Sequence, residues 1–242
     1  MNVKLSSLLL WLVVLPNLQS QEKPKDSIQK LDEVLINSSA IFGNKFVAKN
    51  RTGSSYYISP EELKKFNYTD INRVLRSIPG VNFYEEDGFG LRPNISLRGT
   101  SPERSAKISL MEDGVLIAPA PYSAPAAYYF PSVARMEAVE ILKGSSQVQY
   151  GPFTTGGAIN FISAQIPDNF GGQIRTSLGS FNTQQLHAKI GDSKETIGYM
   201  LEYLNYSSDG FKNLPDASNT GFDINEVVAK FRVNSKAVAA LK

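Results

Sequence analysis

The chain has 242 residues, with 25 basic and 23 acidic side chains and a formal net charge of +2. Because 42% of the residues are hydrophobic and no long run carries one sign of charge, the composition predicts a folded core and argues against nucleic acid as a partner. The absence of cysteine excludes disulfides, thiolate metal sites and cysteine-based catalysis.

Residues 1–20 have the composition of a secretory signal peptide. Lys4 supplies the positive region, Leu8 to Leu15 supply the apolar region, and Pro16 interrupts it. This apolar stretch is shorter than the roughly 20 residues of a helix that spans a membrane. We therefore expect export and cleavage near Ser20 rather than a membrane anchor.

Residues 21–52 read as a flexible leader that contains one strand-like segment near 31–37. A segment of this kind can add as a strand to the sheet edge of a partner, although it can equally be an ordinary short strand of the domain itself. Its central residues are Asp32, Glu33, Val34, Leu35 and Ile36.

Two short helices follow. Ser59-Pro60-Glu61-Glu62 provides a capping residue, a proline at the first position and acids near the positive end of the helix dipole. Thr69-Asp70 begins the second helix and Pro79-Gly80 ends it before a strand at Val81. Four apolar residues of this second helix share one face, namely Ile71, Val74, Leu75 and Ile78.

The next segment alternates short strands with turns. A strand at 94–97 leads into the turn at Arg98-Gly99, and Met111 to Gly114 reads as a hairpin turn of the Asp-Gly type. Glu112 and Asp113 resemble a catalytic carboxylate pair, but an Asp-Gly turn is the simpler explanation of these two residues. The last strand of this region is expected at 158–163.

The order of these motifs resembles the plug of TonB-dependent outer-membrane receptors. The resemblance rests on NRVLRSIPGV at 72–81, on Arg98-Gly99, on VEILKG at 139–144 and on TTGGAIN at 154–160. It implies an α+β plug domain at 53–167, a small mixed sheet with short helices. It also implies energy-coupled import, with segment 31–37 as the TonB box that TonB and its inner-membrane complex pull.

From residue 168 to 242 the pattern changes to segments of alternating polarity. The candidates are 173–180, 185–191, 196–206 and 226–233. One apolar and one polar face is typical of transmembrane barrel strands, and a soluble antiparallel sheet has the same pattern. Together with the resemblance, it predicts the first antiparallel strands of an incomplete β-barrel. Because large plugged transporters use about 22 strands, we expect the chain to be the N-terminal portion of a receptor.

Residues 118–131 contain four prolines and three tyrosines, a composition that presents aromatic side chains rigidly. This segment resembles the apical plug segment of ferric citrate-type siderophore receptors, although a packed loop without a ligand is the alternative. The resemblance implies an iron chelate as the transported ligand. The candidate contacts are Tyr122, Ser123, Tyr128 and Tyr129, with Arg104 and Lys107 as counter-charges for an anionic chelate.

In the family, basic residues at two plug positions face carboxylates of the barrel. Arg98 and Lys143 occupy these positions here. Lys143 stands where arginine is commoner, so it keeps the charge but loses the bidentate fork. The barrel acids that would complete these contacts are expected beyond residue 242.

No phosphate-binding glycine motif is present, and we expect no catalytic residue, metal ligand or cofactor. His187, the only histidine, has no partner set for zinc, and we expect it to be solvated or to face the barrel lumen. The sequence therefore predicts a non-enzymatic outer-membrane receptor for ferric citrate or another siderophore. The alternatives are a soluble periplasmic plug-like binding module and a secreted hydrolase.

Overall fold

The computed structural model describes residues 53–66, 70–117, 129–151, 155–212, 214–215 and 220–233. All of them belong to the unit formed by residues 40–242. The expected signal peptide, the leader and segment 31–37 lie outside the described residues, as do Tyr122, Ser123 and Tyr128.

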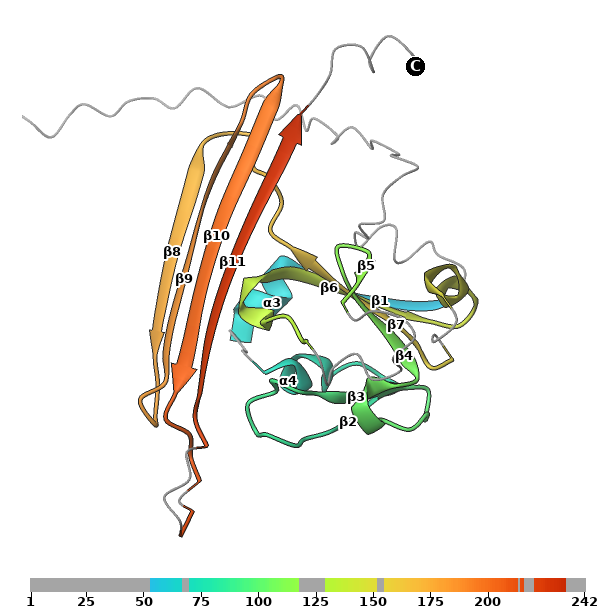
Figure 1. Ribbon diagram of the computed structural model, residues 1–242. Coiled ribbons are helices and arrows are strands. Elements are labelled where there is room, and N and C mark those ends of the chain that lie inside the picture. The colour runs from blue at the N-terminus through green and yellow to red at the C-terminus, as the bar shows by residue number, and fades with distance from the viewer. Residues whose placement is uncertain are drawn as a thin grey trace, which may run out of the picture. The chain divides into compact units, whose positions relative to one another are not determined.

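A five-stranded mixed sheet forms the first part of this unit, with strand order β1-β6-β7-β4-β5 (Figure 1). Strands β4 and β7 pair in parallel, whereas the other neighbours are antiparallel. The strands are β1 Ser54–Ile58, β4 Ile108–Glu112, β5 Val115–Leu116, β6 Met136–Lys143 and β7 Gly157–Ser163. This mixed sheet with few helices confirms the α+β class predicted for the first domain.

Helix α3, Pro60–Phe66, begins with the predicted cap. The Ser59 amide donates to Glu62 Oε2 at 2.8 Å, and the Glu62 amide donates back to Ser59 Oγ at 3.2 Å. These reciprocal hydrogen bonds form a capping box, which satisfies two amides that the helix itself leaves without acceptors.

Helix α4, Ile71–Leu75, is capped by Asp70, whose side chain accepts from the Asn72 amide. The helix is shorter than predicted, and Ile78 reaches the core from a turn in which its amide donates to the Leu75 carbonyl at 3.0 Å. All four residues predicted for its apolar face are buried.

Strands β2, Val81–Tyr84, and β3, Asn94–Leu97, form a separate two-stranded antiparallel sheet. Short 3-10 turns cover 103–105, 133–135 and 145–150. Turns and strands together enclose a large apolar core, and a smaller cluster contains Met111, Leu142 and Ala158. The fully buried members of the large core include Ile71, Leu75, Ile95, Leu97, Ile108, Leu110, Ile141, Ile159 and Phe161.

Gly157 shows why the sequence at the start of β7 requires glycine. A Cβ on this residue would lie 2.4 Å from Leu97 Cδ1 and 2.5 Å from the Leu142 carbonyl oxygen. No side chain fits there, so glycine allows β7 to pack directly against its neighbours.

The second part is a four-stranded antiparallel sheet with order β11-β10-β9-β8 (Figure 1). The strands are β8 Gly171–Leu178, β9 Gln184–Ser193, β10 Ile197–Ser208 and β11 Phe222–Val233. Each overlaps one predicted segment, which confirms the period-two reading of residues after 168. None of the helices in the described ranges has the length and apolar composition of a membrane-spanning helix.

Candidate functional site

The four-stranded sheet has one exposed face rich in apolar side chains and one more buried face that carries both polar and apolar side chains. On β10, alternate residues from Gly198 to Ser208 are buried, whereas Ile197, Tyr199, Leu201 and Tyr203 are exposed. The exposed apolar side chains of the sheet include Ile174, Leu178, Leu186, Ile190, Val227, Phe231 and Val233. This is the reverse of a soluble sheet, in which polar residues meet water and apolar residues form the core.

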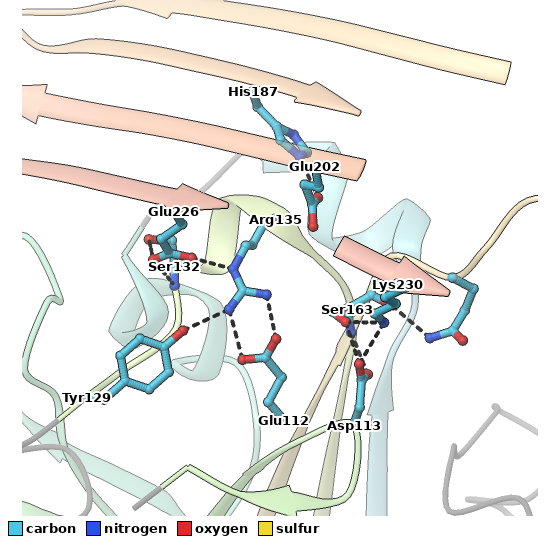
Figure 2. A network of polar contacts seen from close by, with 11 residues as sticks. Glu112, Asp113, Tyr129, Ser132, Arg135, Ser163, His187, Glu202, Glu226 and Lys230 are labelled. Atoms are coloured by element: carbon cyan, nitrogen blue, oxygen red, sulfur yellow. Dashed lines mark hydrogen bonds and ion pairs between the residues drawn. The ribbon is translucent and has the colours of Figure 1, made fainter. Parts of the chain in front are cut away.

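The buried face meets the five-stranded part through a cluster centred on Arg135 (Figure 2). Arg135 ends the 3-10 turn at 133–135, and its side chain is only 2% exposed. Its NH1 and NH2 donate to the two carboxylate oxygens of Glu112 at 2.5 and 2.8 Å, and its Nε donates to Glu226 Oε2. NH2 also donates to the Tyr129 hydroxyl at 2.9 Å. One guanidinium therefore joins β4 to β11.

Ser132 adds two hydrogen bonds to the same glutamate of β11. Ser132 donates to Glu226 Oε1 from its hydroxyl at 2.6 Å and from its amide at 3.3 Å. Both carboxylate oxygens of Glu226 are thereby hydrogen-bonded to residues of the first part.

The electrostatics of Arg135 follow from its two acids. Burial alone lowers its pKa, but the carboxylates of Glu112 and Glu226 outweigh this and raise the pKa above the ordinary arginine value. Arg135 therefore stays charged, as buried guanidinium groups with paired acids do.

A second contact lies four residues further along β11. Lys230 Nζ donates to Asp113 Oδ2 at 2.7 Å and to Ser163 Oγ at 2.6 Å (Figure 2). Asp113 also accepts from the Ser163 amide at 3.0 Å, so it joins β7 to the hairpin turn. On one face of β11, an acid and a base each meet a partner of opposite charge.

Strands β9 and β10 add two further polar pairs. Lys189 Nζ donates to Glu137 Oε1 at 2.7 Å, which joins β9 to β6. His187 Nε2 lies 2.7 Å from Glu202 Oε1 on the neighbouring strand. His187 is on the polar face, as predicted, but it is buried with 4% exposure rather than solvated. The solvated alternative is therefore wrong, since the ring is buried beside the Glu202 carboxylate, whereas the barrel-lumen alternative stays a prediction.

An aromatic cluster forms a further contact between the two parts. The Phe89 ring lies 4.8 Å from Phe222 and 5.3 Å from Phe211, centroid to centroid, and Tyr206 lies 4.7 Å from Phe222. Edge-to-face and tilted arrangements at these distances are favourable. The loop that carries Phe89 is therefore packed against the ends of β10 and β11.

Three of the predicted ligand contacts lie in the described part. Arg104 and Lys107 are exposed, with the Arg104 amide donating to Asn94 Oδ1 at 2.8 Å. Tyr129 is 42% exposed, and its hydroxyl accepts from Arg135. Tyr122, Ser123 and Tyr128 fall outside the described residues.

The two predicted barrel-contact residues have local partners. The Arg98 side chain is exposed, and its amide donates to the Gly80 carbonyl at 2.9 Å. Lys143 Nζ donates to the Pro79 carbonyl at 2.6 Å, and burial lowers its pKa. Their pairing with barrel acids stays a prediction.

Sequence reasoning missed the residues that actually join the two parts. The predicted turn contains Asp113, whereas Glu112 is the last residue of β4, and their carboxylates bind Lys230 and Arg135 respectively. The signal was present in β11, where Glu226 and Lys230 lie on the polar face with opposite charges. Within the described ranges, no group of three or more His, Cys, Asp or Glu side chains is placed to hold a metal ion.

Comparison with known proteins shows what the chain is similar to. Residues 47–158 match the TonB-dependent receptor plug domain. The unliganded ferric citrate transporter FecA shares 26% identity with a TM-score of 0.57, covering 67% of this chain and 26% of the transporter. The ferric yersiniabactin uptake receptor FyuA from Yersinia pestis shares 25% identity with a TM-score of 0.61, covering 77% of this chain and 29% of the receptor.

The siderophore receptor PirA from Pseudomonas aeruginosa shares the fold at 18% identity and a TM-score of 0.52, covering 75% of this chain and 32% of the receptor. The chain thus spans between 26 and 32% of the length of these three solved receptors. Its antiparallel strands resemble the start of their barrels. Residues 47–158 are thus similar to the plug domain of TonB-dependent receptors, and the fold of the chain is similar to part of the fold of these solved receptors.

Proposed function

We propose that this chain is part of an outer-membrane receptor that imports an iron chelate with energy supplied through TonB. The observation that carries the proposal is the arrangement of the strands after the plug. Their apolar side chains are exposed, and their polar side chains bind plug residues.

The exposed apolar face supports an outer-membrane location. An apolar face of this extent is costly in water and favourable against lipid. A soluble periplasmic binding module would turn the same face inward. The proposal includes export by the segment 1–20 and insertion of the strands into the outer membrane.

The proposed ligand is ferric citrate or another siderophore complex. FecA is named as a ferric citrate transporter, and FyuA as a ferric yersiniabactin uptake receptor. The proposed contacts are Arg104, Lys107, Tyr122, Ser123, Tyr128 and Tyr129. Cationic and phenolic side chains suit the oxygen-rich, anionic surface of such chelates. The iron arrives within its chelator, so no protein ligand to the metal is required.

TonB is the proposed partner, and the residues of its contact are Asp32, Glu33, Val34, Leu35 and Ile36. Arg98 and Lys143 are proposed to contact acids of the barrel. Transport of this kind involves no covalent chemistry and therefore no catalytic residue.

A panel of sole iron sources tests the proposal. A strain that lacks the gene should fail to grow on one iron chelate, and the full-length receptor should restore growth. Equal growth of both strains on every chelate would contradict import of iron. With that chelate, binding to Tyr122→Ala and Arg104→Ala receptors tests the proposed contacts. Both should bind more weakly, whereas Tyr84→Ala, an exposed plug tyrosine, should bind as the unchanged receptor does.

A further inference from the structure

Tyr129 connects the proline-rich segment to the buried Arg135 cluster. Its ring is 42% exposed, whereas the Arg135 side chain that donates to its hydroxyl is 2% exposed. The Tyr129 side chain is thus accessible to solvent, and its hydroxyl is hydrogen-bonded to the guanidinium that joins β4 to β11.

The Arg135 guanidinium is one of the contacts that hold β11, beside the Lys230 ion pair and the Phe222 ring contact. Glu112 and Glu226 side chains are 21% and 14% exposed, and they share this one guanidinium. Without it, two poorly solvated carboxylates would repel each other across the interface. A group that fixes the orientation of Arg135 therefore strengthens the contact between the plug and Glu226 of β11.

The Tyr129 hydroxyl has the chemistry for this task. It accepts one N–H from Arg135 and keeps its own proton, because burial raises the pKa of Tyr129 despite the nearby Arg135 charge. The remaining O–H can donate to an oxygen of an anionic ligand. A tyrosine drawn toward a ligand leaves one N–H of Arg135 without its acceptor.

Cavities beside the cluster leave room for water to replace a lost hydrogen-bond partner. Two small cavities, of about 30 and 40 Å³, border Arg135 and Ser132 respectively. Each can admit a water molecule, which needs about 10–15 Å³ of such space. The cluster can therefore rearrange without opening the apolar core.

We propose that Tyr129 is a positioning residue that holds Arg135 against Glu226, and that an oxygen-rich anionic ligand which takes the Tyr129 hydroxyl loosens β11 from the plug. The ligand half of this proposal rests on the proposed import function. The positioning half does not, because it concerns contacts present without ligand. Because the ligand is proposed to act by taking this hydroxyl away from Arg135, removal of the hydroxyl should reproduce the effect of the ligand.

The Ser132 amide provides the readout, because it donates to Glu226 Oε1. Hydrogen exchange of the peptide around Ser132 should be measured on the full-length receptor, with and without saturating ferric citrate. In Tyr129→Phe without ligand, exchange should be about three- to ten-fold faster, the size expected for one lost hydrogen bond. Tyr84→Phe is the matched control, since its hydroxyl makes no hydrogen bond within the described residues.

The outcomes separate the two halves. Unchanged exchange in Tyr129→Phe overturns the proposal, and so does equal acceleration in β7, because that would be general destabilisation. Ferric citrate should accelerate exchange in the unchanged receptor and add little in Tyr129→Phe. If only the substitution has an effect, the positioning role stands, and ferric citrate fails as the ligand that loosens the contact.

Discussion

Arg135 and Glu226 lie 91 residues apart in the chain, yet the guanidinium Nε of one donates directly to the carboxylate of the other. The bond joins the plug to the last described strand of the four-stranded sheet. Because the same guanidinium binds Glu112, a single cation balances acids from two separate strands.

Replacement of Arg135 with methionine should strongly destabilise the receptor. Loss of one partner from a buried ion pair typically costs about 3–5 kcal/mol, because the remaining charges stay buried without compensation. Urea unfolding of the full-length receptor in detergent measures the change. Arg73→Met is the control, because the Arg73 side chain is 58% exposed and pairs with Asp70 only at 3.8 Å. Equal losses in both variants would show that the Arg135 cluster contributes nothing special.

The Asp113 and Lys230 contact should behave as one coupled unit. Asp113→Asn keeps a residue that tolerates the positive φ of 50° at this turn, so it removes the charge alone. We expect a loss of about 1–3 kcal/mol from this variant and from Lys230→Met. The double variant should lose less than the sum. Strict additivity in the unfolding free energies would exclude direct coupling between the two side chains.

Protonation of Asp70 should increase the free energy of unfolding at low pH. Burial raises the pKa of Asp70 above its ordinary value of 3.8, although the hydrogen bond from the Asn72 amide opposes the shift. The folded state therefore binds this proton more tightly. The resulting stability is complete below the unfolded pKa and is lost as the pH rises through the folded pKa.

Asp70→Asn isolates this term, because asparagine caps a helix as well as aspartate does. The unfolding free energy of the variant, relative to the unchanged receptor, should rise between pH 3 and pH 7. Asp168→Asn, at an exposed position, is the control for the substitution itself. A relative stability that falls with rising pH would contradict the predicted sign.

The aromatic cluster should hold the loop that carries Phe89. Phe89→Ala removes ring contacts with Phe211 and Phe222, and we expect a loss of about 1–3 kcal/mol. Phe170→Ala, at a ring that is 69% exposed, serves as the control. Proteolysis of the loop around Phe89 provides the measurement, and equal cleavage in both variants would count against the cluster.

The strands after residue 168 could be predicted because their two faces meet different surroundings. In β11, Val227, Phe231 and Val233 alternate with Glu226 and Lys230, and this period of two is readable from sequence alone. The same holds for α4, where a cap and an apolar face define the helix. The C-terminal end of α4 differs from the prediction. Ile78 has the spacing of a residue on the apolar helix face, but it lies in the turn after the helix and is buried there.

The partners of the polar residues could not be predicted. The alternation of polar and apolar residues in β11 predicts that Glu226 lies on the polar face. It does not predict that Arg135 contacts Glu226, because that contact depends on how distant segments pack. His187 shows the same limit. Its place on the polar face was readable, while its burial depends on Glu202 from the neighbouring strand.

The most direct test of the receptor account is uptake of radioactive iron by cells. The deletion strain should be complemented with the full-length receptor, either unchanged or without residues 31–37, and supplied with the chelate that restores growth. Accumulation that requires both the receptor and this segment is the predicted result. Accumulation that persists without residues 31–37, or that stays at the level of the deletion strain with the unchanged receptor, would contradict TonB-dependent import.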